Sequence, residues 1–426
     1  MPKLSPLPKG LLCLSLIALA SACSSSEKAD ETAAPPAAAT TAAVKPAPKD
    51  WQAKMHSLSA TLSSLMPMIA SKAKFNDPKN AAAIEAETTK LKALSHSLKT
   101  GSKPNSDPSM AIMSELLDED IERALEGLRS GNRDYARDIL KDTTSYCIQC
   151  HTQTNNGPEF PRLELAINTN ELSTLDQAQF FAATRQFDRA LESYEKALSD
   201  PKLAKADPFE WEQAARSALA IVVRVKKDPK ETSRILSQIE VQKSLPASTK
   251  KALKAWKASV QEWAKEKPTP TRTNDQALAK ADELIKRAQK RQEFPLDHSQ
   301  DVLFFRAGSL IHDVLEDKGR TPELSSRALY SAGISAEATR DMNFWTLHET
   351  YYEQCIRTVP HTAQAEKCYG RLRDSVTLGY SGSGGLRLPP EVKRRLERFE
   401  ALAKPEAPKT APETNGGSTE PPKTGA

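Results

Sequence analysis

The distribution of hydrophobic and polar residues predicts a chain made almost entirely of helices. Apolar side chains recur at spacings of three and four residues, and the alternation of apolar and polar residues that is typical of strands is nearly absent. Ala, Leu, Lys and Glu, which suit helices, dominate the composition. The pattern therefore predicts an all-α protein.

Residues 51–157 are expected to form a bundle of four antiparallel helices. Asp77 and Asp107 each precede a proline, and a capping carboxylate followed by proline marks the start of a helix. Gly131 separates the third helical stretch from the fourth. Four helices of this length joined by short loops favour an antiparallel bundle.

Helical patterns continue over residues 171–400, after a linker at residues 158–170. The segment "LDQAQFFAATRQFDRALESYEKALSDP" resembles a tetratricopeptide repeat, and a degenerate copy ends in "HETYYEQCIRTVPHTAQAEKCYG". The matching positions of the first copy are Ala178, Phe181, Ala190, Tyr194, Ala197 and Pro201. The resemblance implies an irregular α-solenoid that binds a protein partner, redox or scaffold, or that serves only as scaffold.

Three further helices are predicted inside this solenoid, at residues 210–225, 249–266 and 301–317. Residues 401–426, rich in Pro, Lys, Glu, Thr and Gly, are expected to form a disordered tail.

The first residues have the composition of an export signal. A basic start and the apolar run Leu11–Ala20 precede small residues and Cys23, and the run is too short to stay as a transmembrane helix. "ASAC" resembles the lipobox of bacterial lipoproteins, which implies that residues 1–22 are removed and Cys23 is lipidated. An ordinary cleaved signal is the alternative. Residues 23–50, rich in Ser, Ala, Thr and Pro, are expected to form a disordered tether.

The same lipoprotein resemblance favours the periplasmic face of the outer membrane over the inner one, because Ser24 and Ser25 follow the cysteine. Removing the signal takes away Lys3 and Lys9 and no acidic residue, so the net charge falls from +5 to +3. This balance indicates no nucleic-acid partner.

Cys355 and Cys368 are predicted to form a disulfide. The midpoint between them falls at the break formed by Pro360 and His361, so an antiparallel helix pair would bring them face to face, and an exported chain meets an oxidising compartment. A metal site that includes His361 and a pair of free buried thiols are the alternatives.

Cys147, Cys150 and His151 form a C-x-x-C-H group, the attachment motif of a c-type haem. In that chemistry two thiols add to the haem vinyl groups and the adjacent imidazole binds the iron. On a helix the three side chains share one face. A zinc site needs a second pair of ligands, but the next Cys or His is His298, and a thioredoxin-like motif needs a preceding strand. The motif therefore predicts one covalently bound haem c.

A haem motif at the end of a fourth helix resembles class II cytochromes c, the family of cytochrome c-prime. The resemblance implies that Met55, in the first helix, is the second axial ligand of the iron. Met55 shares an apolar stripe with Leu58, Leu62, Leu65 and Ile69. Core packing of Met55, ligation by Met66, Met68 or His56, and five-coordinate iron are the alternatives.

These patterns predict a membrane-tethered periplasmic monohaem cytochrome that transfers electrons. A haem-based sensor of gas or peroxide and a scaffold with structural haem are the alternative functions. An enzyme is not expected, because no distal acid–base pair is evident. His298, His312 and His348 have no partners at ligand spacing and are expected to be ordinary helical residues.

Overall fold

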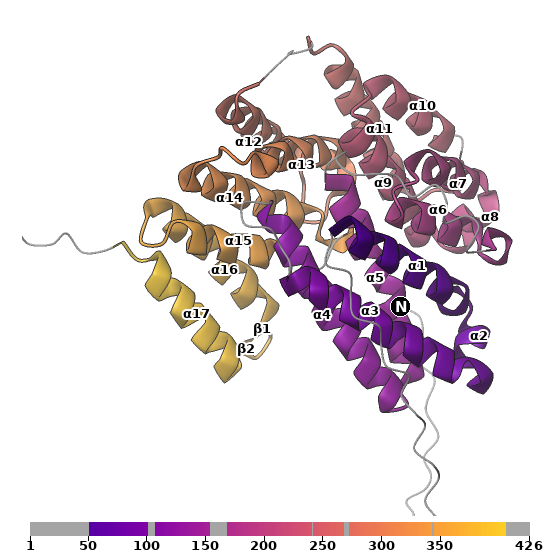
Figure 1. Ribbon diagram of the computed structural model, residues 1–426. Helices are drawn as coiled ribbons and strands as arrows, with labels where there is room; N and C mark the ends of the chain where they lie inside the picture. Colours follow the sequence, from indigo (N-terminus) through magenta and orange to yellow (C-terminus); the bar gives the residue numbers. More distant parts are fainter. Residues whose placement is uncertain are drawn as a thin grey trace, which may run out of the picture. The chain divides into compact units, whose positions relative to one another are not determined.

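The computed structural model describes residues 51–100, 107–153, 168–240, 242–267, 272–342 and 345–405 (Figure 1). These residues form helices throughout, apart from one two-stranded hairpin, which confirms the all-α class. No helix in these ranges is long and apolar enough to cross a membrane. The signal at 1–22, Cys23, the tether at 23–50 and the linker up to residue 167 lie outside the described residues, as does the tail beyond residue 405.

The N-terminal part consists of four long helices, each in contact with two of the others, and two short elements between the first two of them. Their bounds are α1 (Trp51–Ala70), α2 (Lys72–Asn76), η1 (Pro78–Asn80), α3 (Ala81–Thr100), α4 (Pro108–Arg129) and α5 (Arg133–Gln153). Helix α1 contacts α3 and α5, and α4 contacts α3 and α5 (Figure 1). The predicted caps are present: the carboxylate of Asp77 accepts from the Lys79 amide, and that of Asp107 from the Ser109 amide.

The middle of the chain forms shorter helices. They are η3 (Thr169–Glu171), α6 (Thr174–Ala183), α7 (Phe187–Ser199), α8 (Pro201–Ala206), α9 (Pro208–Ala220), the π-helix η4 (Ile221–Lys226), α10 (Pro229–Ile239) and α11 (Ala247–Ala264). Helices α9, η4 and α11 cover the two predicted segments 210–225 and 249–266. Trp211 and Trp256 are fully buried among them, and their indole nitrogens donate to the carbonyls of Leu198 and His298.

The C-terminal helices complete the described chain. They are α12 (Asn274–Arg291), η5 (His298–Gln300), α13 (Asp301–Glu316), α14 (Pro322–Ala338), η6 (Arg340–Met342), α15 (Leu347–Thr358), α16 (Ala363–Gly379), the strands β1 (Ser381–Gly382) and β2 (Gly385–Leu386), and α17 (Pro390–Ala403). Gly333 lets α14 and α15 approach closely, since a Cβ there would lie 2.3 Å from the Tyr352 ring.

Cys355 and Cys368 are joined in a disulfide between α15 and α16, as predicted. Their Cα atoms lie 6.3 Å apart, and both side chains are fully buried. The chain reverses at the predicted break, where His361 adopts a left-handed conformation with φ 59°. The disulfide therefore fastens the two helices close to the turn that connects them.

Two hydrophobic cores connect the N-terminal helices with the rest of the chain. Leu65 and Ile69 of α1 belong to a core completed by α12 to α17, whereas Leu62 and Met66 belong to one completed by α6 to α11 and part of α13. Neighbouring positions on one face of α1 thus enter different cores. The described residues form one compact unit, and the domain boundaries proposed within it stay a prediction.

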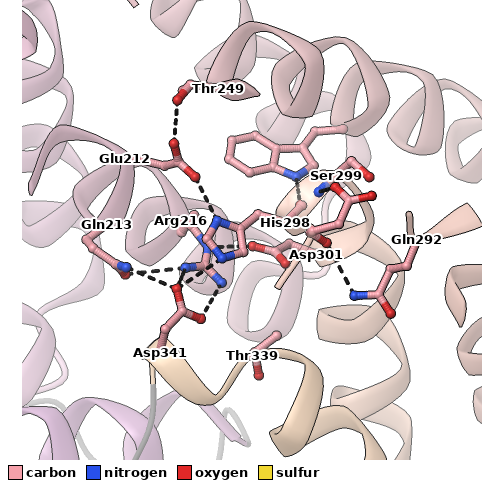
Figure 2. A network of polar contacts seen from close by, with 12 residues as sticks. Glu212, Gln213, Arg216, Thr249, Gln292, His298, Ser299, Asp301, Thr339 and Asp341 are labelled. Carbon is pink, nitrogen blue, oxygen red and sulfur yellow. Dashed lines mark hydrogen bonds and ion pairs between the residues drawn. The ribbon is translucent and has the colours of Figure 1, made fainter. Parts of the chain in front are cut away.

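A buried charge network connects α9, η5, α13 and η6 (Figure 2). The Arg216 guanidinium, whose side chain is fully buried, donates from Nε to Asp301 Oδ2 at 2.6 Å and also pairs with Asp341. His298 lies between two carboxylates, with Nδ1 2.7 Å from Glu212 Oε1 and Nε2 3.1 Å from Asp341 Oδ2. The second contact is an ion pair rather than a well-aligned hydrogen bond. His298 is therefore not the ordinary helical residue that the sequence suggested.

The other two histidines also have polar partners. His312 Nδ1 lies 3.0 Å from Asp107 Oδ2, which connects α13 to the start of α4. His348 Nε2 lies 2.6 Å from the Ser375 hydroxyl. Each partner is distant in sequence, so helix periodicity alone gave no sign of it.

Stability is expected to fall as pH rises past neutrality because His298 loses its proton. Burial alone would lower the pKa of His298, but Asp341 and Glu212 outweigh it and raise the pKa to about 9; Arg216 opposes this shift and Asp301 supports it. Because the folded pKa lies above the unfolded value of about 6.5, the stabilisation is complete below about pH 6.5 and is lost as pH rises through about 9. This difference between the folded and unfolded pKa of His298 corresponds to about 3 kcal/mol of folding stability.

The measurement is the free energy of urea unfolding at several pH values, for the wild type and for His298→Gln. The difference in unfolding free energy between the wild type and the variant should shrink as the pH rises from about 6.5 to about 9. Since burial lowers the pKa of His348 to about 4, that histidine acts only at lower pH. Parallel profiles between pH 6.5 and 9 would contradict the assignment of this effect to His298.

Candidate functional site

The C-x-x-C-H group lies in the last two turns of α5 and faces a cavity. Cys147, Cys150 and His151 all line it, as their spacing on one helix face predicts. The cavity has about 720 Å³ of empty space, including the part open to solvent.

The cavity lies where four helix ends meet. The start of α1, the end of α3, the start of α4 and the end of α5 supply its walls, as expected when consecutive helices run in opposite directions. Most of the lining is apolar. It comprises Trp51, Met55, Leu58, Leu62, Leu91, Leu98, Met110, Met113, Leu117, Tyr146 and Ala183, with Ser59, Ser114 and Thr143 as polar members, besides the three motif residues.

Both motif cysteines are free thiols in an apolar environment. Burial raises the pKa of Cys147 to about 11 and that of Cys150 to about 12. The Cys150 Sγ lies 3.2 Å from Met110 Sδ. A thioredoxin-like thiol needs a lowered pKa, so this environment disfavours that chemistry.

The His151 imidazole is neutral and buried. Burial first, and then the Arg185 guanidinium, lower its pKa to about 4, against a smaller opposing effect of the Ala183 carbonyl. Its Nδ1 has no hydrogen-bond partner of normal geometry among the described residues. A neutral imidazole retains a nitrogen lone pair, which is the form that binds a metal.

Three methionines line the cavity, and sequence reasoning singled out one of them. Met55 of α1 lines the cavity, whereas Met66 packs in a hydrophobic core and His56 is exposed. Met110 and Met113 of α4 were not proposed as ligands. The antiparallel order of the helices was the available signal, because it places the start of α4 beside the end of α5.

Helices beyond the motif also contact it. Ala183, at the end of α6, lines the cavity, and Arg185 in the following turn donates from Nη1 to the His151 carbonyl at 3.2 Å. Gln149 donates to the Met342 carbonyl, and Gln153 to the Tyr351 hydroxyl. The C-terminal turns of α5 are therefore held by segments that lie up to about 200 residues away in the sequence.

The donor set suits a haem better than a bare metal ion. Within the described ranges, no group of three or more His, Cys, Asp or Glu residues could hold a metal ion. A haem iron already has four nitrogen ligands from its macrocycle, so the protein needs to supply only an axial ligand such as a histidine. One neutral imidazole and two thiols at the edge of an apolar cavity match that requirement.

Comparison with known proteins assigns this chain to no family. No protein-family model, curated protein or solved structure matches the chain. The function therefore has to be inferred from the residues of the cavity.

Proposed function

We propose that this chain is a membrane-tethered periplasmic c-type cytochrome that transfers electrons through a single haem. The observation that carries the proposal is the convergence of Cys147, Cys150 and His151 on one apolar cavity. Cys147 and Cys150 would hold the haem by thioether bonds, and His151 would bind its iron from one side. The haem supplies an iron that gains or loses one electron.

The surrounding residues have separate tasks in this proposal. The apolar side chains from α1, α3 and α4 exclude water from the haem faces, which limits the approach of other reactants. The neutral His151 imidazole offers its lone pair without first losing a proton. The α1–α5 segment then corresponds to a four-helix haem domain of the class II type.

The helices from α6 onward would form the tetratricopeptide-like part. Helices α6 and α7 contact each other, and Ala178 and Ala190, at the small-residue positions of the repeat, are fully buried. Stacked helical pairs of this kind commonly bind another protein chain. We propose that this part docks the cytochrome to a redox or scaffold partner, while a lipid on Cys23 tethers it to the membrane.

Met55 is proposed as the second axial ligand, and its replacement gives a direct test of an electron carrier. Met55→Leu keeps the volume and apolar character of the side chain but removes the sulfur. The wild type should show a low-spin absorption spectrum that carbon monoxide does not change. The variant should become high-spin and bind carbon monoxide, with the haem still attached.

Met110→Leu and Met113→Leu are the matched controls, because both methionines line the same cavity. Each should retain the low-spin spectrum. A high-spin spectrum in one of these variants instead would assign the iron ligand to that methionine. A wild type that is already high-spin and binds carbon monoxide would replace electron transfer with gas sensing as the function.

A further inference from the structure

Arg185 lies beside the haem motif although it belongs to the turn between α6 and α7. Its side chain is buried, with 5% of the residue exposed, and its Nη1 donates to the His151 carbonyl at 3.2 Å. Its guanidinium also lies over the Phe187 ring, 5.4 Å from the centroid. A positive charge is therefore held close to the proposed iron ligand, in a place that solvent barely reaches.

Arg185 directly follows the last turn of α6 and has φ 59°, a left-handed conformation that is common just past a helix end. This conformation costs free energy for a residue with a Cβ, whereas glycine adopts it without strain. A glycine would relieve the strain but would remove the cation.

The Arg185 guanidinium is held next to the motif by its hydrogen bond to the His151 carbonyl. Because the group is buried, salt in the solvent screens it weakly.

We propose that Arg185 is a positioning residue that raises the reduction potential of the haem held by Cys147, Cys150 and His151. The inference rests on the proposed function. Ferrous iron carries one positive charge less than ferric iron, so a fixed cation nearby favours the reduced state. One electron is added from a redox partner or mediator, and no proton or bond in the protein has to change.

This inference gives the first helical pair beyond the α1–α5 segment a role in the redox site itself. Ala183 lines the cavity, and Arg185, two residues later, places a positive charge beside it. A partner that displaced the α6–α7 turn would thereby alter the potential of the haem.

The test is an equilibrium redox titration of the full chain, exported together with a cytochrome c maturation system and studied in the presence of small-molecule mediators. Arg185→Gln removes the charge. At a fixed applied potential, the ratio of ferrous to ferric protein should fall about tenfold, which corresponds to a 59 mV shift for one electron. Arg185→Lys keeps the charge and should stay close to the wild type.

Arg189→Gln is the matched control. Arg189 is also a partly buried arginine near the start of α7, but its guanidinium lies over Phe181, 4.0 Å from the ring centroid, and donates to Gln186. Its loss should change the ferrous-to-ferric ratio less than threefold. The shift of Arg185→Gln should also persist in 1 M salt, where exposed charges are screened.

Arg185→Asn provides a second charge-removing variant, since asparagine tolerates the left-handed conformation well and keeps the turn intact if Arg185→Gln folds poorly. The inference is overturned if both variants carry haem at the wild-type potential, or if Arg189→Gln produces an equal shift. A wild-type chain that carries no covalent haem would instead refute the proposed function, so the two failures are distinct.

Discussion

Replacing both Cys147 and Cys150 with serine will give a chain that holds no haem after denaturation. The two thiols line one cavity with His151, and they are the only free cysteines among the described residues. Serine is close in size to cysteine but does not form the thioether. The measurement is a haem stain on a denaturing gel of protein made with a cytochrome c maturation system.

Each single variant is the matched control for the double variant. Cys147→Ser and Cys150→Ser leave one thiol each, and a single thioether is enough to keep haem on the denatured chain. The staining should therefore fall in the single variants and vanish only in the double variant. Haem that survives denaturation in the double variant would remove this pair as the attachment site and would refute the proposed function.

Arg216→Met will destabilise the protein by about 3–5 kcal/mol, the usual loss when one partner of a buried ion pair is removed. Asp301, whose side chain is 1% exposed, would keep a carboxylate without its cation. Burial already raises the pKa of Asp301 above its ordinary value, and Arg216 opposes that rise. Methionine fills much of the volume of arginine, so the loss reports charge more than packing. The free energy of urea unfolding measures it.

Arg234→Met is the control on an exposed arginine. Arg234 pairs with Glu195 and Glu231, but its side chain is 44% exposed, and surface pairs contribute about 0–1 kcal/mol. Adding Asp301→Leu to Arg216→Met should recover part of the loss, because it removes the uncompensated charge. Equal losses in Arg216→Met and Arg234→Met would show that the buried network contributes no special stability.

The local parts of this protein could be predicted because their causes are local. Asp77 and Asp107 cap the elements that follow them, since a carboxylate needs only its own next two or three amides. The helix period places Cys147, Cys150 and His151 on one face whatever surrounds them. The pairing of Cys355 with Cys368 was predicted because the break at Pro360 and His361 lies midway between them.

Other parts could not be predicted, because long-range packing decides them. Helix α1 ends at Ala70 and Ser71 then caps the short helix α2, a break that no periodicity marked. Helix α1 enters two cores through Leu65 and Leu62, a division that depends on which later helices cover each position. His298 gained its two carboxylate partners from α9 and η6 in the same way.

The sequence by itself determined that the chain is helical, where several helices begin, which residues form the motif, and which cysteines pair. Each of these depends on spacings within about one or two helical turns or across one short turn. Only the tertiary structure decided that Met110 and Met113 share the cavity with Met55, and that Arg185 lies against His151. Such contacts require helices that are far apart in the chain to bury their apolar faces together, and no local spacing encodes that choice.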